Sequence, residues 1–207
     1  MKQKLNLKTW NRKEHFLFFK QMEEPFFGIT TSIDCTKAYE KSKELNVSFF
    51  TYYLHKTLVA VNQIESFRYR IVADEVYVFD TINASATILR EDNTFGFSLV
   101  EFNSDLENFA VITKKEIARI QTTKGLFTRE FSENVIHFSA LPWIDFSSFS
   151  HARSYTWPDS CPKISFGKIM EGNGKKTFSM SVHVHHGLMD GFHVGQFVTL
   201  FQDLMNE

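Results

Sequence analysis

Four of the eight histidines lie within eleven residues near the C-terminus, in the stretch SMSVHVHHGLMDGFHVGQF. They are His183, His185, His186 and His193. Side chains alternate between the two faces of an extended strand, so His186 continues an apolar face here, whereas His183 and His185 share the opposite face. An imidazole at the end of an apolar face is partly desolvated, which favours its neutral form. A neutral imidazole held in place is what general-base catalysis requires, so His186 is a candidate general base.

A carboxylate follows His186 at a defined spacing. Asp190 lies four residues later and is followed by Gly191, which makes the pattern H-x-x-x-D-G at the junction of a strand and a helix. Asp190 could orient the imidazole directly, or it could pair with a cation and brace the turn. The doubled HHGLMDG, between an alternating strand and an amphipathic helix, is much more specific than a lone HxxxD.

The same histidines allow an alternative, which is a zinc site. His183 and His185 share a face at i and i+2, but a zinc site needs a third protein ligand and His186 faces the other way. No cysteine or carboxylate lies at a recognisable ligand spacing from them. We therefore expect no metal, and we expect His183, His185 and His193 to be polar residues at an interface or on a solvated face.

Two elements are expected to position this stretch. The segment 163–186 has two extended arms joined by EGNGK, which is typical of a β-hairpin. The segment 191–207 has apolar residues at helical spacing and is predicted to close the chain as an amphipathic helix. The hairpin therefore carries His186 to the end of a strand, and the helix begins directly after Asp190.

Helical and strand patterns are mixed along the rest of the chain. Helices are predicted over 9–22 with Thr9 as N-cap, over 48–67 with Ser48 as N-cap, and from 104 onward, where Ser104 and Glu107 have the spacing of a capping box. Strands are predicted at 29–36, 84–90, 95–102 and 136–143, with a hairpin over 68–80 that turns at 73–75 and an irregular loop near 150–162. This order predicts an α+β fold, in which a mostly antiparallel or mixed β-sheet is covered by a few α-helices. We expect residues 1–207 to form a single domain.

Composition argues against several classes of function. The net charge is −1 without a basic patch, so we expect no nucleic-acid partner. There is no run of about 18 apolar residues and no apolar signal-peptide region, so we expect a soluble cytoplasmic protein with no membrane partner. Cys35 and Cys161 are far apart in sequence, which is typical of a reducing compartment. The 23 phenylalanines predict a Phe-rich core or a wide aromatic pocket.

Three motifs carry a resemblance to a known family. The stretch His185–His193, HHGLMDGFH, matches residue for residue the signature H-H-x-x-x-D-G-[FY]-H of the chloramphenicol acetyltransferases. TWNRKEHFLFF resembles the opening helix of that family, TSID its first strand, and FSALPWIDFSSF its central S-x-x-P-W segment. The resemblance covers nearly the whole chain. Peptide-synthetase condensation domains share HHxxxDG but are much longer, and lipoyl acyltransferase cores share H-x-x-x-D-G without the other two motifs.

The resemblance implies a fold, an assembly and a set of roles. The fold is that of a CoA-dependent acyltransferase, and the assembly is a homotrimer with active sites at the subunit interfaces. Acetyl-CoA is then a co-substrate, and no cofactor is bound permanently. By position, His186 is the general base, Ser139 donates a hydrogen bond to the oxyanion of the tetrahedral intermediate, and Ser165 holds a water near it. Arg12 and Asp190 form a structural ion pair that holds the base in place.

The resemblance also implies an acceptor pocket lined by aromatic rings. The acceptor-binding positions are occupied by phenylalanines, namely Phe18, Phe19, Phe27, Phe95, Phe127 and Phe149. Phe19, however, stands where a tyrosine usually binds an acceptor hydroxyl, and Glu23, His151 and Arg153 fall where apolar residues are usual. Polar groups that face an apolar acceptor discriminate strongly between substrates.

Three hypotheses about function remain open at this point. The first is acetyl transfer from acetyl-CoA to a hydroxyl of chloramphenicol, which would confer resistance to this antibiotic. The second is the same chemistry on a different small hydroxylated acceptor. The third is a catalytically idle trimeric binding protein, against which the intact set of His186, Ser139, Arg12 and Asp190 argues. Acyl transfer to a hydroxyl needs a base for its proton and a donor for the oxyanion, and these residue types supply both.

Overall fold

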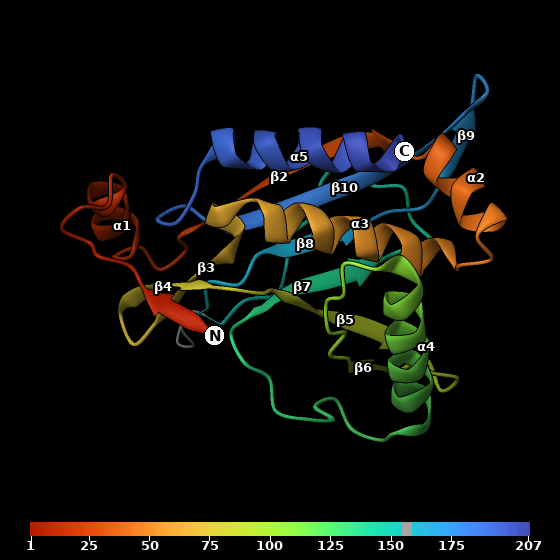
Figure 1. Cartoon of the computed structure of the whole chain (residues 1–207), viewed down its shortest axis with the longest axis horizontal. Coiled ribbons are helices and arrows are strands. Elements are labelled where there is room, and N and C mark those ends of the chain that lie inside the picture. The colour runs from red at the N-terminus through yellow and green to blue at the C-terminus, as the bar shows by residue number, and fades with distance from the viewer. Residues whose placement is uncertain (155–158) are drawn as a thin grey trace.

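The seven-stranded β-sheet that forms the centre of the molecule is mixed (Figure 1). The computed structural model describes residues 1–154 and 159–207. The strands lie in the order β2-β10-β8-β7-β5-β6, and β9 pairs with β10 beside this path. Their bounds are β2 (Phe26–Asp34), β5 (Asn83–Leu89), β6 (Phe95–Phe97), β7 (Val135–Ala140), β8 (Lys163–Phe166), β9 (Met170–Gly172) and β10 (Lys175–His185).

The predicted α+β fold with a mixed sheet is confirmed. Strand β10 is antiparallel to both of its neighbours β2 and β8, whereas β7 is parallel to β8 and β5. The predicted EGNGK hairpin joins β9 to β10, with positive φ angles of 52° at Asn173 and 74° at Gly174. Two left-handed residues in succession are what a two-residue type I′ hairpin turn requires.

A smaller antiparallel sheet includes the N-terminal segment of the chain. It contains β1 (Lys2–Lys4), β3 (Tyr69–Val72) and β4 (Glu75–Phe79) in the order β1-β4-β3. The predicted hairpin over 68–80 is present as β3 and β4, and Ala73 and Asp74 adopt the positive φ of its turn. Strand β1 was not predicted, because its three residues are all exposed and polar and carry no apolar pattern.

Two long helices cover one face of the large sheet and form the core with it. They are α3 (Phe49–Gln63), which continues into the short 3-10 helix η1 (Glu65–Arg68), and α5 (Gly191–Met205). Figure 1 shows both lying across the same side of β10 and β8. Phenylalanines fill the space between these layers, including Phe138, Phe166 and Phe178 from the sheet and Phe197 and Phe201 from α5. The predicted Phe-rich core is therefore confirmed.

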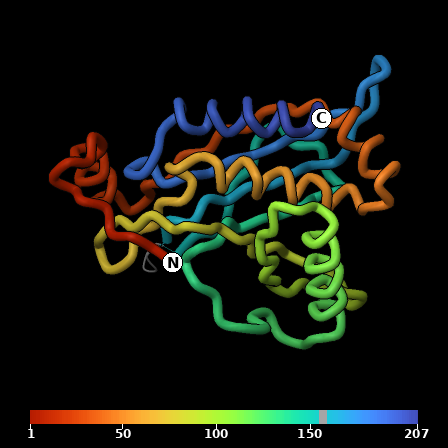
Figure 2. The backbone as a smooth tube through the Cα atoms, viewed as in Figure 1, coloured from red at the N-terminus to blue at the C-terminus, as the bar shows by residue number. Residues whose placement is uncertain are grey.

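The remaining helices lie at the two ends of the sheet. Helix α1 (Lys13–Phe19) lies at one end, beside the loop between β10 and α5, and α2 (Thr36–Glu44) and the β9–β10 hairpin lie at the other (Figure 2). Helix α4 (Leu106–Thr122) packs near β5 and β6. Within the described residues, no helix is long and apolar enough to span a membrane.

Two predicted helix starts are wrong, and hydrogen bonds made just before each helix explain both. Helix α1 begins at Lys13 and not near Thr9, because the backbone carbonyl of Asn6 accepts hydrogen bonds from the N–H groups of Thr9 and Trp10 and holds them in a turn. Helix α4 is capped by Asp105, whose carboxylate accepts from the Asn108 N–H at 2.9 Å, so Ser104 does not form the predicted capping box.

Several predicted lengths also differ from the structure. Helix α2 was not predicted, because it is polar and buries only two side chains, Ala38 and Ser42. The strand predicted over 95–102 stops at Phe97. Beyond it the chain contacts β5 through a hydrogen bond from the Ser98 N–H to the Ala86 carbonyl at 2.9 Å and through a bridge from Val100 to Ala84. The irregular loop near 150–162 has no helix or strand in its described part, and residues 155–158 lie outside the described residues.

Candidate active site

His186 occupies the first position after β10, where hydrogen bonds to two other segments of the chain hold its backbone. Its N–H donates to the Pro25 carbonyl at 2.8 Å, and its carbonyl accepts from the Arg12 guanidinium at 3.2 Å. Directly before it, His185 accepts a hydrogen bond at Nδ1 from the Gly187 N–H at 3.1 Å. The position of the imidazole is therefore set by contacts on both sides of the turn.

Two aromatic rings hold the His186 imidazole. Phe19, the last residue of α1, stacks on it with ring centroids 4.0 Å apart and an interplanar angle of 9°. Phe27 of β2 packs against it at 4.5 Å. Its Nδ1 is buried and has no hydrogen-bond partner within the described residues, so the edge that carries Nε2 is the part of the ring left for a substrate. Phe19 and Phe27, expected to bind the acceptor, are thus the immediate neighbours of the candidate base.

Asp190 braces the turn after His186. Its carboxylate forms an ion pair with Arg12 (Nη1 to Oδ2, 2.6 Å), accepts from the Phe192 N–H at 3.1 Å, and lies 2.8 Å from His193 Nδ1. Burial by itself would raise the pKa of Asp190, but hydrogen bonds from Arg12 and His193 lower it to about 2. Of the two roles left open by the sequence, the pairing with a cation is the one that this geometry favours.

The ion pair leads to a prediction about stability and pH. Replacing Asp190 by asparagine should lower the free energy of unfolding by about 1–3 kcal/mol at pH 7, because Arg12 is only 8% exposed and loses its charged partner. The folded-state pKa lies below the unfolded value of 3.8, so this contribution is present above about pH 4 and is lost as the pH falls toward 2. Urea unfolding of both proteins at several pH values measures it. A difference between wild type and variant that disappears between pH 7 and 5 would contradict the prediction.

The other histidines of the motif have structural contacts, and one prediction about them is wrong. His185 was expected at an interface or on a solvated face, but it is only 3% exposed, because the turn folds over it. Burial lowers the pKa of His185 to about 4. His193 caps α5 together with Asp190. His183 packs over Gly28 of the neighbouring strand, where a Cβ would overlap its imidazole, so only glycine leaves room for this ring.

Ser139 and Ser165 lie side by side on the face of the sheet opposite to α3 and α5, called here the outer face. Cα pairing places Ser139 of β7 opposite Ser165 of β8, and Ser165 opposite Ser181 of β10. Side chains in one such row point to the same side of a sheet. Ser165 is fully buried, and its Oγ lies 3.4 Å from Nε2 of His151, which belongs to the loop after β7.

The six predicted acceptor-binding phenylalanines separate into two groups. In the first group, Phe19 and Phe27 contact His186, and Phe18 packs edge-on against Phe19 at 5.1 Å. The second group lies along the outer face, where Phe149 packs against His151 at 4.7 Å. Phe95 and Phe127 both contact Phe97 near the sheet edge, and Phe127 is 72% exposed.

Ser139 and His186 of the same chain lie far apart. His186 is five residues beyond Ser181, and Ser139 is two strands away from Ser181 in the same row, which together give a separation of about 19 Å. His186 contacts Phe27, whose cross-strand partner Val184 is on the core face, whereas Ser139 is on the outer face. One chain therefore cannot present both side chains to a single small molecule.

The outer face also holds a cluster of potential metal ligands that the sequence did not indicate. Ligand atoms of His137, Asp159 and Cys161 lie within 4.8 Å of one another. However, Asp159 forms an ion pair with Lys163, and the buried guanidinium of Arg70 interacts with the Cys161 thiol. Two buried cations oppose the approach of a metal ion, so we interpret this cluster as a charge network.

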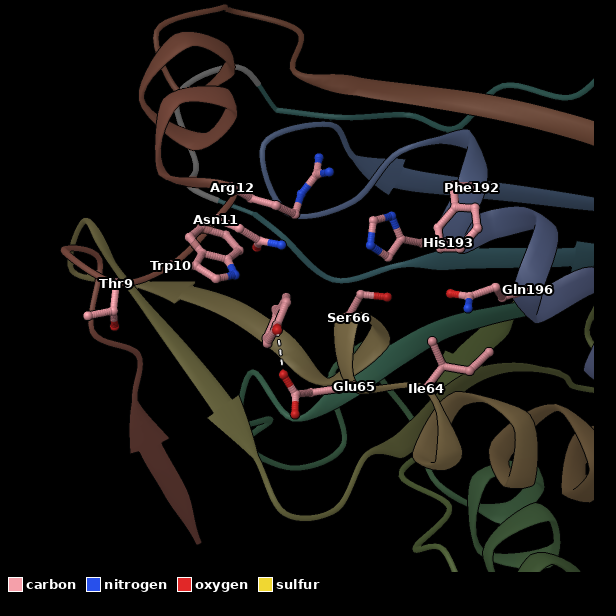
Figure 3. A pocket seen from close by; sticks show the side chains of 11 residues that line it. Thr9, Trp10, Asn11, Arg12, Ile64, Glu65, Ser66, Phe192, His193 and Gln196 are labelled. Carbon is pink, nitrogen blue, oxygen red and sulfur yellow. Dashed lines mark hydrogen bonds between the residues drawn. The ribbon is translucent and has the colours of Figure 1, made fainter.

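Two surface cavities lie away from these residues. One, of about 740 Å³, lies between the N-terminal segment, η1 and the start of α5, where Trp10, Glu65 and Phe192 contribute to its walls (Figure 3). The other, of about 880 Å³, lies between the β5–β6 turn and the end of α4. Neither His186 nor Ser139 lines either cavity.

Sequence reasoning missed several residues of the outer face. His137, Asp159 and Lys163 are distant in sequence from the histidine motif, and only the strand register places His137 and His183 on either side of Lys163. The available signal was the alternation of polar and apolar residues in each strand, which indicates that the polar ones share a face. It could not show that the three strands align in this register.

Solved structures define the class of this protein. The chain superposes on a dihydrolipoamide acetyltransferase (E2p) of Azotobacter vinelandii with a TM-score of 0.69 at 11% identity, over 94% of this chain and 86% of that one. At this identity the likeness concerns the fold alone. The protein has the acyltransferase fold, with His186 at the end of a central strand.

Closer relatives define the family. The family model of chloramphenicol acetyltransferase matches residues 2–202. Chloramphenicol acetyltransferase 3 of Escherichia coli is 30% identical over 205 residues, which are 98% of this chain and 96% of that protein. A solved chloramphenicol acetyltransferase superposes with a TM-score of 0.92 at 29% identity, over 99% of this chain and 100% of that one. The chain belongs to the chloramphenicol acetyltransferase family.

Proposed function

We propose that this chain is an acetyl-CoA-dependent O-acetyltransferase that acetylates a hydroxyl of chloramphenicol. The observation that carries the proposal is the setting of His186, a half-buried imidazole between Phe19 and Phe27 whose backbone is tied to Pro25 and Arg12. Membership of the family supports the choice of donor and acceptor. An idle binding protein is the weaker alternative, because the Arg12–Asp190 pair that braces the base is intact.

In the proposed reaction His186 acts twice. Its Nε2 takes the proton of the acceptor hydroxyl as the oxygen attacks the thioester carbonyl carbon of acetyl-CoA. Ser139 Oγ donates a hydrogen bond to the oxyanion of the tetrahedral intermediate, and Ser165 holds a water beside it. When the intermediate collapses, the C–S bond breaks and His186 returns the proton to the departing thiolate, which leaves as CoA. The other product is the acetyl ester.

The separation of the two side chains supports a site shared between protomers. An oxyanion donor must lie about 2.7–3.1 Å from the oxygen that it stabilises, whereas His186 and Ser139 of one chain are about 19 Å apart. We propose that His186 of one protomer faces Ser139 of the next, in a homotrimer with three equivalent sites. The exposed ring of Phe18, on the His186 side, and the exposed rings of Phe95 and Phe127, on the Ser139 side, supply apolar surface for such an interface.

The core and the cysteines of the chain bear on its domain organisation and its cellular compartment. We propose that residues 1–207 form one chloramphenicol acetyltransferase-like domain, supported by a single core cluster that includes Phe16 near the N-terminus and Met205 near the C-terminus. Both cysteines are free and buried, which supports a reducing compartment such as the cytoplasm. There the activity would provide resistance to chloramphenicol.

Thiol release from acetyl-CoA by the purified protein tests the proposed activity. We expect release to rise on addition of chloramphenicol and acetylated chloramphenicol to appear in equal amount, as detected by mass spectrometry. The control is chloramphenicol whose hydroxyls are already acetylated, which cannot accept another group. Thiol release that is the same with and without chloramphenicol would refute this choice of acceptor, although slow hydrolysis that requires His186 would leave the general base in place.

A further inference from the structure

The outer face beside Ser139 is lined by imidazoles. His137 precedes Ser139 by two residues on the same strand and so shares its face, and Lys163 and His183 lie in the same cross-strand row as His137. His151 lies over this surface, with Nε2 3.4 Å from Ser165 Oγ and its ring edge-on to His183 at 5.0 Å. An acceptor placed against Ser139 therefore lies close to several imidazoles.

These imidazoles are uncharged at neutral pH. Burial, with a smaller contribution from the neighbouring cation Lys163, lowers the pKa of His137 and of His151 to about 4. Burial also lowers the pKa of His183. A neutral imidazole has one N–H donor and one nitrogen acceptor, so each ring can pair with either end of a hydroxyl or amide group.

The formal charges on this face have partners already. Lys163 forms an ion pair with Asp159, and Arg153 forms an ion pair with Glu24 while its guanidinium stacks over Phe26 at 3.6 Å. A bound acceptor would therefore meet neutral hydrogen-bonding groups and no unbalanced charge. This chemistry fits a neutral, hydroxyl-rich molecule better than an anion or an apolar ring.

We propose that His151 determines acceptor specificity, by hydrogen-bonding a hydroxyl or amide group of the acceptor beside Ser165. His151 then favours acceptors that place a hydroxyl or amide group at this position, and it slows acetylation of those, chloramphenicol included, that place an aromatic ring there. The inference rests on the proposed function, because it requires an acceptor against Ser139. His151 Nε2 already pairs with Ser165 Oγ, so a ring there would leave the other nitrogen of the imidazole without a partner in a desolvated place, which lowers kcat/KM about 5- to 150-fold.

The test compares kcat/KM for chloramphenicol and for a neutral polyol, methyl glucoside, in the wild type, His151→Leu and His151→Gln. We expect His151→Leu to raise kcat/KM for chloramphenicol about ten-fold and to lower it for methyl glucoside by a similar factor. His151→Gln, which keeps a donor and an acceptor, should stay near the wild-type ratio. His15→Leu makes the same substitution on the exposed face of α1 and serves as the matched control. Thermal unfolding midpoints check that each variant is folded.

The outcomes separate this inference from the proposed function. If the wild type acetylates chloramphenicol and His151→Leu is equal to it or slower, the role of His151 is refuted and the proposed activity stands. If only methyl glucoside is acetylated, and only while residue 151 can hydrogen-bond, the role of His151 stands and chloramphenicol is not the acceptor. If neither is acetylated, calorimetric binding of chloramphenicol decides: tighter binding to His151→Leu supports the role, and equal or weaker binding refutes it.

Discussion

The His186→Ala variant is expected to lose about 10²–10⁴-fold in kcat for acetyl transfer, because a positioned general base contributes about that factor. The KM for acetyl-CoA should change much less, since the imidazole acts on the acceptor proton. Steady-state thiol release over a range of acetyl-CoA concentrations, at saturating chloramphenicol, measures both quantities.

Loss of packing has to be separated from loss of the base. Alanine also removes the ring that stacks between Phe19 and Phe27, so the thermal unfolding midpoint must be compared with that of the wild type. His186→Gln keeps much of the volume without the basic nitrogen, and His15→Ala, on the exposed face of α1, is the matched control. If His186→Gln kept more than about a tenth of the wild-type kcat, general-base catalysis by this residue would be ruled out.

The second large effect is expected at Ser139. Replacing it by alanine should lower kcat about 10²–10³-fold, as for other donors to a developing oxyanion, with little effect on stability because the side chain is only half-buried. Ser139→Thr keeps the hydroxyl and should recover part of the rate. Equal rates for the alanine variant and the wild type would remove Ser139 from the mechanism.

Mixing the two inactive variants tests whether the site is shared. In trimers formed at random from equal amounts of His186→Ala and Ser139→Ala chains, about a quarter of the sites should contain both an intact His186 and an intact Ser139. Refolding the mixture should therefore restore about a quarter of the wild-type activity. Separately refolded variants that are combined afterwards provide the control. A refolded mixture no more active than this control would show that the two residues do not act across an interface.

Local sequence patterns were sufficient for the elements around the base. The alternation in β10, the EGNGK turn and the apolar spacing of α5 depend on residues close together in the chain, and each was predicted near its observed position. Elements with weak patterns were missed or misplaced. Helix α2 has no apolar stripe, and the start of α1 depends on the turn around Asn6.

In the candidate site, too, the contacts between residues distant in sequence could not be predicted from local patterns. The contact of Arg12 with Asp190 joins residues 178 positions apart, and it was expected only because the chain resembles its family. The burial of His185 was not predicted, because it results from the turn after β10 and from Phe26 of the neighbouring strand. The charge network of Asp159, Lys163 and Arg70 had no signal in the sequence, since it forms only when β8 and its neighbours pair.

By itself, the sequence determined the family and the candidate base, because the pattern H-H-x-x-x-D-G places His186 and Asp190 within one strand end and the turn that follows it. Only the tertiary structure decided which residues surround that base and which lie beside Ser139. Strand register and the face on which a side chain lies depend on pairing between distant segments, and a shift of one residue would reverse the face. For the same reason, only the folded chain shows that His186 and Ser139 are too far apart to meet within one protomer.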